Sequence, residues 1–168
     1  MNFTPQLSEV RAIAAEKKYD VVPISCEILS DICTPIEAMQ ILKNVSTHCY
    51  LLESVAEREK WGRYTFLGFD PKLDITCSGR NMKIGDVRIK TEHPAQQLRQ
   101  ILAEYKSPRL PELPPFTGGL VGYFSYDFLK YAESSVDLET RDTENFKDVD
   151  LINSSQLTGR ILYAPLSA

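Results

Sequence analysis

Three polar residues near the ends of two expected strands could bind a zwitterionic amino acid. Glu53 and Ser54 close one apolar run, and Arg63 opens the next run after a charged loop at residues 57–60. A carboxylate favours an ammonium group, and a guanidinium binds a carboxylate through charge-assisted hydrogen bonds. Binding groups often gather at such strand ends. From spacing alone an ordinary surface salt bridge is the preferred interpretation, and the amino-acid site is the alternative.

No other spacing in the sequence indicates catalysis or a cofactor. His48 lies in a strand-like run and His93 precedes a proline, and neither has a sequence neighbour that suggests a triad or a metal site. Gly118, Gly119 and Gly122 lack the lysine and hydroxyl residue of a phosphate loop. The four cysteines lack the paired short spacing of a zinc site or redox dithiol, so buried free thiols are expected. We expect no catalytic, metal or cofactor site in this chain.

Composition limits the class of protein. The chain has 168 residues, of which 43% are hydrophobic, which suits one domain of ordinary size with a packed core. The net charge of -4 provides no basic field for nucleic acid. No apolar run approaches the roughly 20 residues that span a bilayer, and the N-terminus does not resemble a secretory signal. We therefore expect a cytoplasmic protein that binds neither nucleic acid nor membrane.

Local patterns predict helices in the first part of the chain. Thr4 as N-cap and Pro5 at the first helical position predict a helix over residues 4–18. Alternation of apolar and polar residues predicts a strand over 22–28. Thr34 and Glu37, with a proline between them, form a capping box that predicts a helix over 34–44.

The middle of the chain has the pattern of an antiparallel sheet. A stripe of apolar residues at helical spacing then predicts a helix around 98–105, and the glycine-rich run 116–127 predicts a buried strand in the centre of the sheet. We expect an α+β fold, with an antiparallel β-sheet or sandwich flanked by about three helices. Short β-branched or aromatic runs predict strands at 47–54, 63–69, 73–77, 81–84 and 87–90.

The end of the chain differs in character from the rest. Residues 133–150 are acidic and are expected to form a solvated loop. An apolar strand begins near residue 149 and gives way to a polar run, so we expect a domain over 1–152 and a non-native or disordered tail over 153–168. The alternative is a native polar loop with a short strand at 161–163.

Two long motifs resemble the N-terminal region of anthranilate synthase component I, a chorismate-utilising enzyme. They are CYLLESVAEREKWGRYTFLGFDPKL at residues 49–73 and FTGGLVGYFSYDFLKYAE at 116–133. The resemblance covers about residues 3–151. The related aminodeoxychorismate synthase component I, of the folate branch, shares the glycine and tyrosine strand and is the close alternative. A free-standing binding or scaffold module without catalysis is the second alternative.

The resemblance implies an N-terminal fragment of a larger two-part enzyme. Such an enzyme converts chorismate and ammonia to anthranilate and pyruvate in tryptophan biosynthesis, and a glutamine amidotransferase subunit, component II, supplies the ammonia. The family's catalytic histidine and its Mg²⁺ ligands lie in a downstream region, so this chain alone is expected to be inactive. A domain separated from its partner exposes apolar surface and strand edges, and self-association is one expected outcome.

The resemblance also implies feedback inhibition by tryptophan. The family's Leu-Leu-Glu-Ser motif matches residues 51–54, which makes Leu52, Glu53 and Ser54 expected tryptophan contacts. A basic contact of the family maps to Arg63 or Tyr64, and the charge argument favours Arg63. The remainder of the family's pocket lies downstream, so the affinity of this chain alone for tryptophan is expected to be much reduced.

Overall fold

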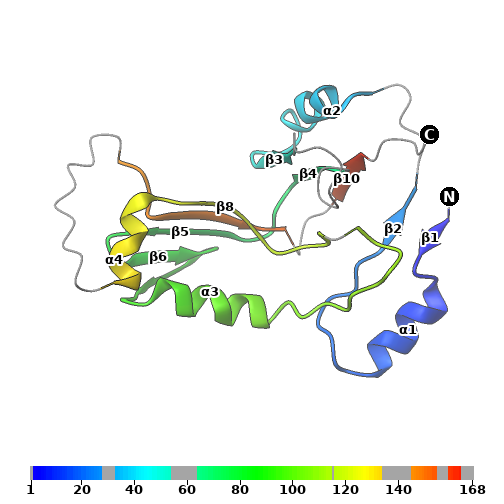
Figure 1. The fold of residues 1–168 in the computed structure, drawn as a ribbon, viewed down its shortest axis with the longest axis horizontal. Coiled ribbons are helices and arrows are strands. Elements are labelled where there is room, and N and C mark those ends of the chain that lie inside the picture. The colour runs from blue at the N-terminus through cyan, green and yellow to red at the C-terminus, as the bar shows by residue number, and fades with distance from the viewer. Residues whose placement is uncertain are drawn as a thin grey trace. The chain divides into compact units, whose positions relative to one another are not determined.

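The computed structural model describes residues 2–27, 33–53, 64–114, 116–133, 145–154 and the backbone of 159–163. The chain forms two compact units (Figure 1). The first comprises Met1–Pro71, Ser107–Thr117 and Leu157–Ala168, and the second comprises Lys72–Lys106 and Gly118–Gln156. None of the helices in these described ranges is long and apolar enough to cross a membrane.

The first unit begins with strand β1 (Phe3–Thr4), which pairs with β2 (Ser25–Cys26). Helix α1 (Leu7–Ala15) starts after Gln6, whose backbone amide donates to Glu9 Oε2 at 2.7 Å. The prediction that Thr4 caps this helix was wrong. Thr4 is paired with Ser25, so its backbone is extended and the helix begins later.

Helix α2 (Pro35–Leu42) confirms the predicted capping box. The Thr34 hydroxyl accepts from the Glu37 amide at 3.3 Å, and Glu37 Oε2 accepts from the Thr34 amide at 2.8 Å. These bonds satisfy backbone donors that the first helical turn leaves without partners.

A three-stranded antiparallel sheet in the first unit carries the expected amino-acid site. Its order is β10-β4-β3, with β3 (Cys49–Leu52), β4 (Thr65–Phe69) and β10 (Gly159–Tyr163). Leu67 at the middle of β4 is 1% exposed, and Tyr50 on β3 is also buried. Burial of these side chains holds the ends of β3 and β4 in a defined register.

A five-stranded antiparallel sheet forms the second unit, in the order β7-β6-β5-β9-β8. Helix α3 (Pro94–Ala103), the 3₁₀ turn η1 (Tyr126–Phe128) and the short helix α4 (Leu129–Ala132) accompany it (Figure 1). The strands are β5 (Asp74–Ser78), β6 (Asn81–Ile84), β7 (Val87–Lys90), β8 (Leu120–Phe124) and β9 (Val149–Asn153).

The core of the second unit lies on one face of this sheet. Ile75, Met82 and Val149 come from three different strands and are at most 1% exposed. Leu98 and Ile101 of α3 pack against them, which confirms the predicted apolar stripe of this helix. The mixture of helices with antiparallel sheets confirms the α+β class.

Two predictions about the strands were wrong. The run of short strands does not form one sheet, because β3 and β4 belong to one sheet and β5 to β7 to the other. Asp70, with a φ of 50°, and Pro71 interrupt the chain between β4 and β5. The glycine-rich strand β8 lies at the edge of its sheet, not in the centre, and leaves Phe124 51% exposed.

Strand β9 crosses the boundary that was expected after residue 152. Asn153 is the last residue of β9 and is fully buried, as is Ser154. The Ser154 amide and hydroxyl both donate to the Gly119 carbonyl, at 2.7 and 2.9 Å. β10 contains the short strand of the alternative interpretation, and the origin of residues 153–168 stays a prediction. Most of the expected acidic loop, residues 134–144, lies outside the described residues.

Candidate functional site

Two of the four expected amino-acid contacts lie in the described part of the chain, at the end of β3. Leu52 is paired with Phe66 of β4 and is 42% exposed. Glu53 follows the strand and is exposed, and its Oε1 accepts a hydrogen bond from the Thr65 hydroxyl at 3.3 Å. This bond orients a solvent-accessible carboxylate that could accept hydrogen bonds from an ammonium group.

The side chains of Leu52 and Glu53 project from opposite faces of the sheet. Successive side chains on a strand alternate between faces. Leu52 lies opposite Phe66 and Glu53 reaches Thr65, so the register of β3 with β4 continues one residue past the strand. A ligand that contacts the Glu53 carboxylate would meet Leu52 through its backbone. Ser54 and Arg63 lie outside the described residues, so their approach to Glu53 stays a prediction.

Aromatic side chains pack together next to Leu52. The Phe66 ring meets the Phe116 ring edge-on, with centroids 5.4 Å apart and an interplanar angle of 87°. Tyr64 contributes a third ring, 5.8 Å from that of Phe66. Edge-on pairs at this separation are favourable beyond the area that they bury. No sequence pattern predicted this contact, which joins residues from both long motifs.

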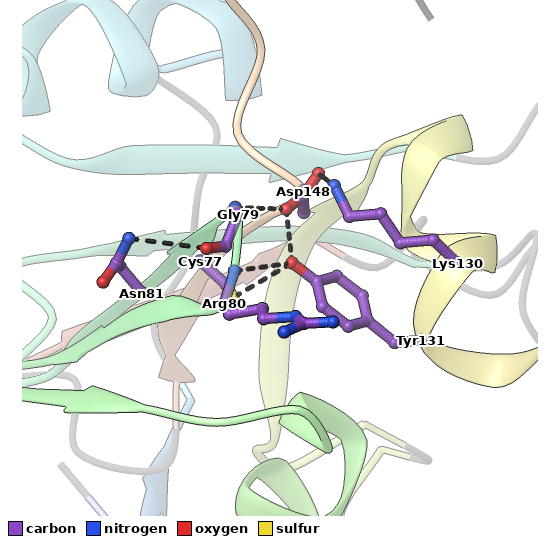
Figure 2. Close-up of polar contacts among 7 residues, drawn as sticks. All are labelled: Cys77, Gly79, Arg80, Asn81, Lys130, Tyr131 and Asp148. Carbon is purple, nitrogen blue, oxygen red and sulfur yellow. Dashed lines mark hydrogen bonds and ion pairs between the residues drawn. The ribbon is translucent and has the colours of Figure 1, made fainter. Parts of the chain in front are cut away.

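A second polar centre, in the second unit, forms around the buried carboxylate of Asp148 (Figure 2). Lys130 Nζ lies 2.7 Å from Oδ1, and the Tyr131 hydroxyl donates to Oδ2 at 2.6 Å. The Gly79 amide donates to the same Oδ2 at 2.8 Å. The Tyr131 hydroxyl in turn accepts from the Arg80 amide at 3.1 Å. Asp148 therefore joins the β5–β6 turn, helix α4 and the start of β9.

These contacts determine which groups are charged. Burial alone would raise the pKa of Asp148, but hydrogen bonds from Lys130, Tyr131 and Gly79 outweigh it and lower the pKa below its ordinary value. Burial, reinforced by the hydrogen bond to Asp148, raises the pKa of Tyr131. Burial also raises the pKa of Cys77, whose thiol lies 3.9 Å from the Tyr131 hydroxyl. The centre thus contains an ionised carboxylate, a neutral phenol and a protonated thiol.

The contacts of this centre suit it to stabilising the fold and make it a poor candidate for catalysis. The carboxylate is fully engaged by its donors, and a protonated, buried thiol is a poor nucleophile. Across the described ranges, no three histidine, cysteine, aspartate or glutamate residues are grouped so that they could hold a metal ion. The sequence did not point to Asp148, because this residue follows an acidic run, where a solvated side chain is the ordinary expectation.

Comparisons with known proteins give a consistent family. No family model matches the chain. Anthranilate synthase component 1 of Acetivibrio thermocellus is 37% identical over 137 residues, which cover 79% of this chain and 27% of the relative. The Pseudomonas aeruginosa protein of the same name is 37% identical over 68% of this chain. A probable anthranilate synthase component 1 of Schizosaccharomyces pombe is 34% identical over 85% of this chain.

A solved structure supports the same fold. The crystal structure of anthranilate synthase component I from Streptococcus pneumoniae superimposes with a TM-score of 0.51 and 23% identity, over 84% of this chain and 29% of that one. The chain therefore spans about a quarter of the length of the curated relatives that it matches. These matches identify the chain as a relative of anthranilate synthase component I that corresponds to the N-terminal part of those proteins.

Proposed function

We propose that this chain acts as the N-terminal, tryptophan-sensing portion of an anthranilate synthase component I. The curated relatives support the family, and the chain's correspondence to about a quarter of their length supports a part of the enzyme. The whole enzyme would convert chorismate and ammonia to anthranilate and pyruvate in the cytoplasm. A component II amidotransferase would supply the ammonia from glutamine.

The proposed sensor is the polar group at the end of β3. The observation that supports it most is the exposed Glu53 carboxylate, which the Thr65 hydroxyl orients from the neighbouring strand. In this proposal Glu53 binds the ammonium group of tryptophan, and Ser54 and Arg63 bind its carboxylate. Leu52 contributes backbone contacts on the same strand end.

The chain alone would hold only part of this machinery. The described residues include no metal-binding cluster, and Mg²⁺ would belong to the larger remainder of the enzyme. We expect the isolated chain to form no anthranilate from chorismate and ammonia, which a fluorescence assay for anthranilate would test directly. We also expect weak or absent heat when it is titrated with tryptophan, because an incomplete pocket excludes little water from the ligand.

The site assignment can be tested in a chimeric enzyme. The corresponding segment of the Acetivibrio thermocellus protein would be replaced by this chain, and inhibition by tryptophan would be measured. Glu53→Gln and Ser54→Ala should each raise the tryptophan concentration for half inhibition by about 10-fold, because each removes a charge-assisted or hydroxyl hydrogen bond. The KM for chorismate should stay unchanged. Glu27→Gln, at another exposed carboxylate of the first unit, serves as the matched control.

Unchanged sensitivity in both variants would show that the sensor lies elsewhere. Product analysis of the full-length enzyme to which this chain belongs separates the two related pathways, since aminodeoxychorismate in place of anthranilate would support the folate-branch alternative. A chimera that folds but neither reacts with chorismate nor responds to tryptophan would favour the stand-alone binding module.

A further inference from the structure

The two edge strands of the five-stranded sheet differ in how they are protected. Natural sheets guard a free edge with charged side chains or short strands, because a free edge can pair with another chain. Edge strand β7 carries Arg88 and Lys90. Edge strand β8 has the sequence LVGYF and carries no charge, and its Tyr123 and Phe124 are 40% and 51% exposed. Within the described residues β8 pairs with β9 alone.

The backbone groups on the free edge of β8 can be identified from its pairing with β9. The Gly119 carbonyl accepts from the Ser154 amide, and the Ser125 amide donates to the Asp148 carbonyl. Backbone groups of alternate residues point to opposite sides of a strand. Odd-numbered residues from 119 to 125 therefore face β9. Leu120, Gly122 and Phe124 direct their amides and carbonyls outward.

The β8 strand is sterically complementary to itself in the antiparallel direction. The residues of β8 before Gly122 are aliphatic, and those after it are aromatic. A two-fold axis through Gly122 would place Leu120 opposite Phe124 of a second copy, and Val121 opposite Tyr123. Aromatic and aliphatic or β-branched residues form favourable cross-strand pairs, and no like charges would meet.

The same two-fold axis would bring the outward-directed amides and carbonyls of the two β8 strands within hydrogen-bonding reach of each other. Gly122 would face Gly122 of the second copy as a hydrogen-bonded pair, and Leu120 and Phe124 would form the flanking hydrogen-bonded pairs. Each such pair exchanges two bonds in an antiparallel ladder, so the edge would gain about six. A register shifted by one residue, with the axis between Gly122 and a neighbouring residue, would place outward-directed groups opposite inward-directed ones and form none of these bonds.

We propose that the free edge of β8 pairs with β8 of a second copy of this chain, about a two-fold axis at Gly122. The pairing joins two five-stranded sheets into one continuous antiparallel sheet. It is an isologous contact, in which the same surface serves both copies. The proposal is independent of the tryptophan site, which lies in the other unit.

The pairing predicts a charge-dependent dimer that sedimentation equilibrium can measure. Val121 and Tyr123 meet across the axis twice, so the double variant Val121→Lys with Tyr123→Lys places like charges opposite each other. We expect this variant to raise the dimer Kd by about 10-fold or more. Val121→Glu with Tyr123→Lys changes the same two positions but pairs opposite charges, and its Kd should return to within about 3-fold of the unmodified chain. Val87→Lys on β7, where the side chain is 61% exposed, should leave the Kd unchanged.

Hydrogen exchange of the unmodified chain provides a second readout that needs no variant. The Gly122 amide should exchange slowly at high protein concentration and rapidly on dilution, because its acceptor lies in the second copy. Circular dichroism confirms that each variant folds. The proposal is overturned if the chain stays monomeric up to about millimolar concentration, if both double variants weaken the dimer equally, or if Gly122 exchange is independent of concentration.

Discussion

At the scale of the residue, Asp148 shows how a buried charge is kept ionised. Its carboxylate receives hydrogen bonds from a lysine and a phenol of α4 and from a backbone amide of the β5–β6 turn. The acidic composition around it predicted a solvated side chain, since burial of a charge depends on partners distant in the sequence. The position of Glu53 at the end of a strand, by contrast, was predicted from local sequence, and its role in binding stays a prediction.

We expect Asp148→Asn to reduce the free energy of unfolding by about 1–3 kcal/mol at pH 7, because the lysine loses its buried counter-charge. The lowered pKa of Asp148 means that its stabilising contribution is present above the ordinary carboxyl pKa of about 4 and is lost as the pH falls through the folded-state value. The difference between wild type and variant in urea unfolding should therefore shrink on acidification. Asp150→Asn, in a more exposed ion pair with Lys147, is the control and should cost about 0.5 kcal/mol or less. Equal losses in both variants would contradict the account.

Tyr131 should ionise at a higher pH than an ordinary tyrosine. Its raised pKa favours the neutral phenol, so its contribution to stability is present below the ordinary value of about 10 and is lost as the pH rises through the folded-state value. In an absorbance titration of the protein at 295 nm, the contribution of Tyr131 should appear above the ordinary tyrosine range. Tyr131→Phe should abolish this late fraction. A titration curve that loses no late fraction on the Tyr131→Phe substitution would show that the hydroxyl is not held by Asp148.

At the scale of the element, sequence patterns predicted the features of helices that depend on residues close together in the chain. The Thr34 and Glu37 capping box set the start of α2, and the apolar stripe of α3 faces the core. The position of β8 at the edge of its sheet could not be predicted, because strand order depends on which distant segment pairs with it. The three glycines were compatible with a central strand and with an edge strand.

Gly122 lets β8 approach β9 closely, which gives a test of this pairing. A Cβ at Gly122 would overlap the Asp150 carbonyl oxygen and lie 2.8 Å from Leu151 Cα. Its φ of 150° also disfavours other residues. Gly122→Ala should cost about 3 kcal/mol or more of unfolding free energy in urea. Gly79→Ala has a positive φ but open space around it, and should cost only about 1 kcal/mol. A ranking in the opposite order would mean that β8 and β9 are not in this register.

At the scale of the whole molecule, the chain corresponds to only a part of the length of its relatives. Its two motifs predicted the relatives that the comparisons then identified, and the apolar stripe around residues 98–105 predicted the helix that packs on the core of the second unit. The division into two units was not predicted, since one core was expected from the length alone. Which sheet a strand joins depends on pairing between residues far apart in the sequence. The alternation of apolar and polar residues within each strand is the same whether the strands form one sheet or two.

The most direct test of the account is whether this chain can replace its counterpart in a working enzyme. The measurement is anthranilate formation by the Acetivibrio thermocellus protein with its corresponding segment exchanged for this chain, with and without tryptophan. We predict anthranilate formation that tryptophan inhibits. A soluble, folded chimera that forms anthranilate at the same rate with and without tryptophan would contradict the central claim.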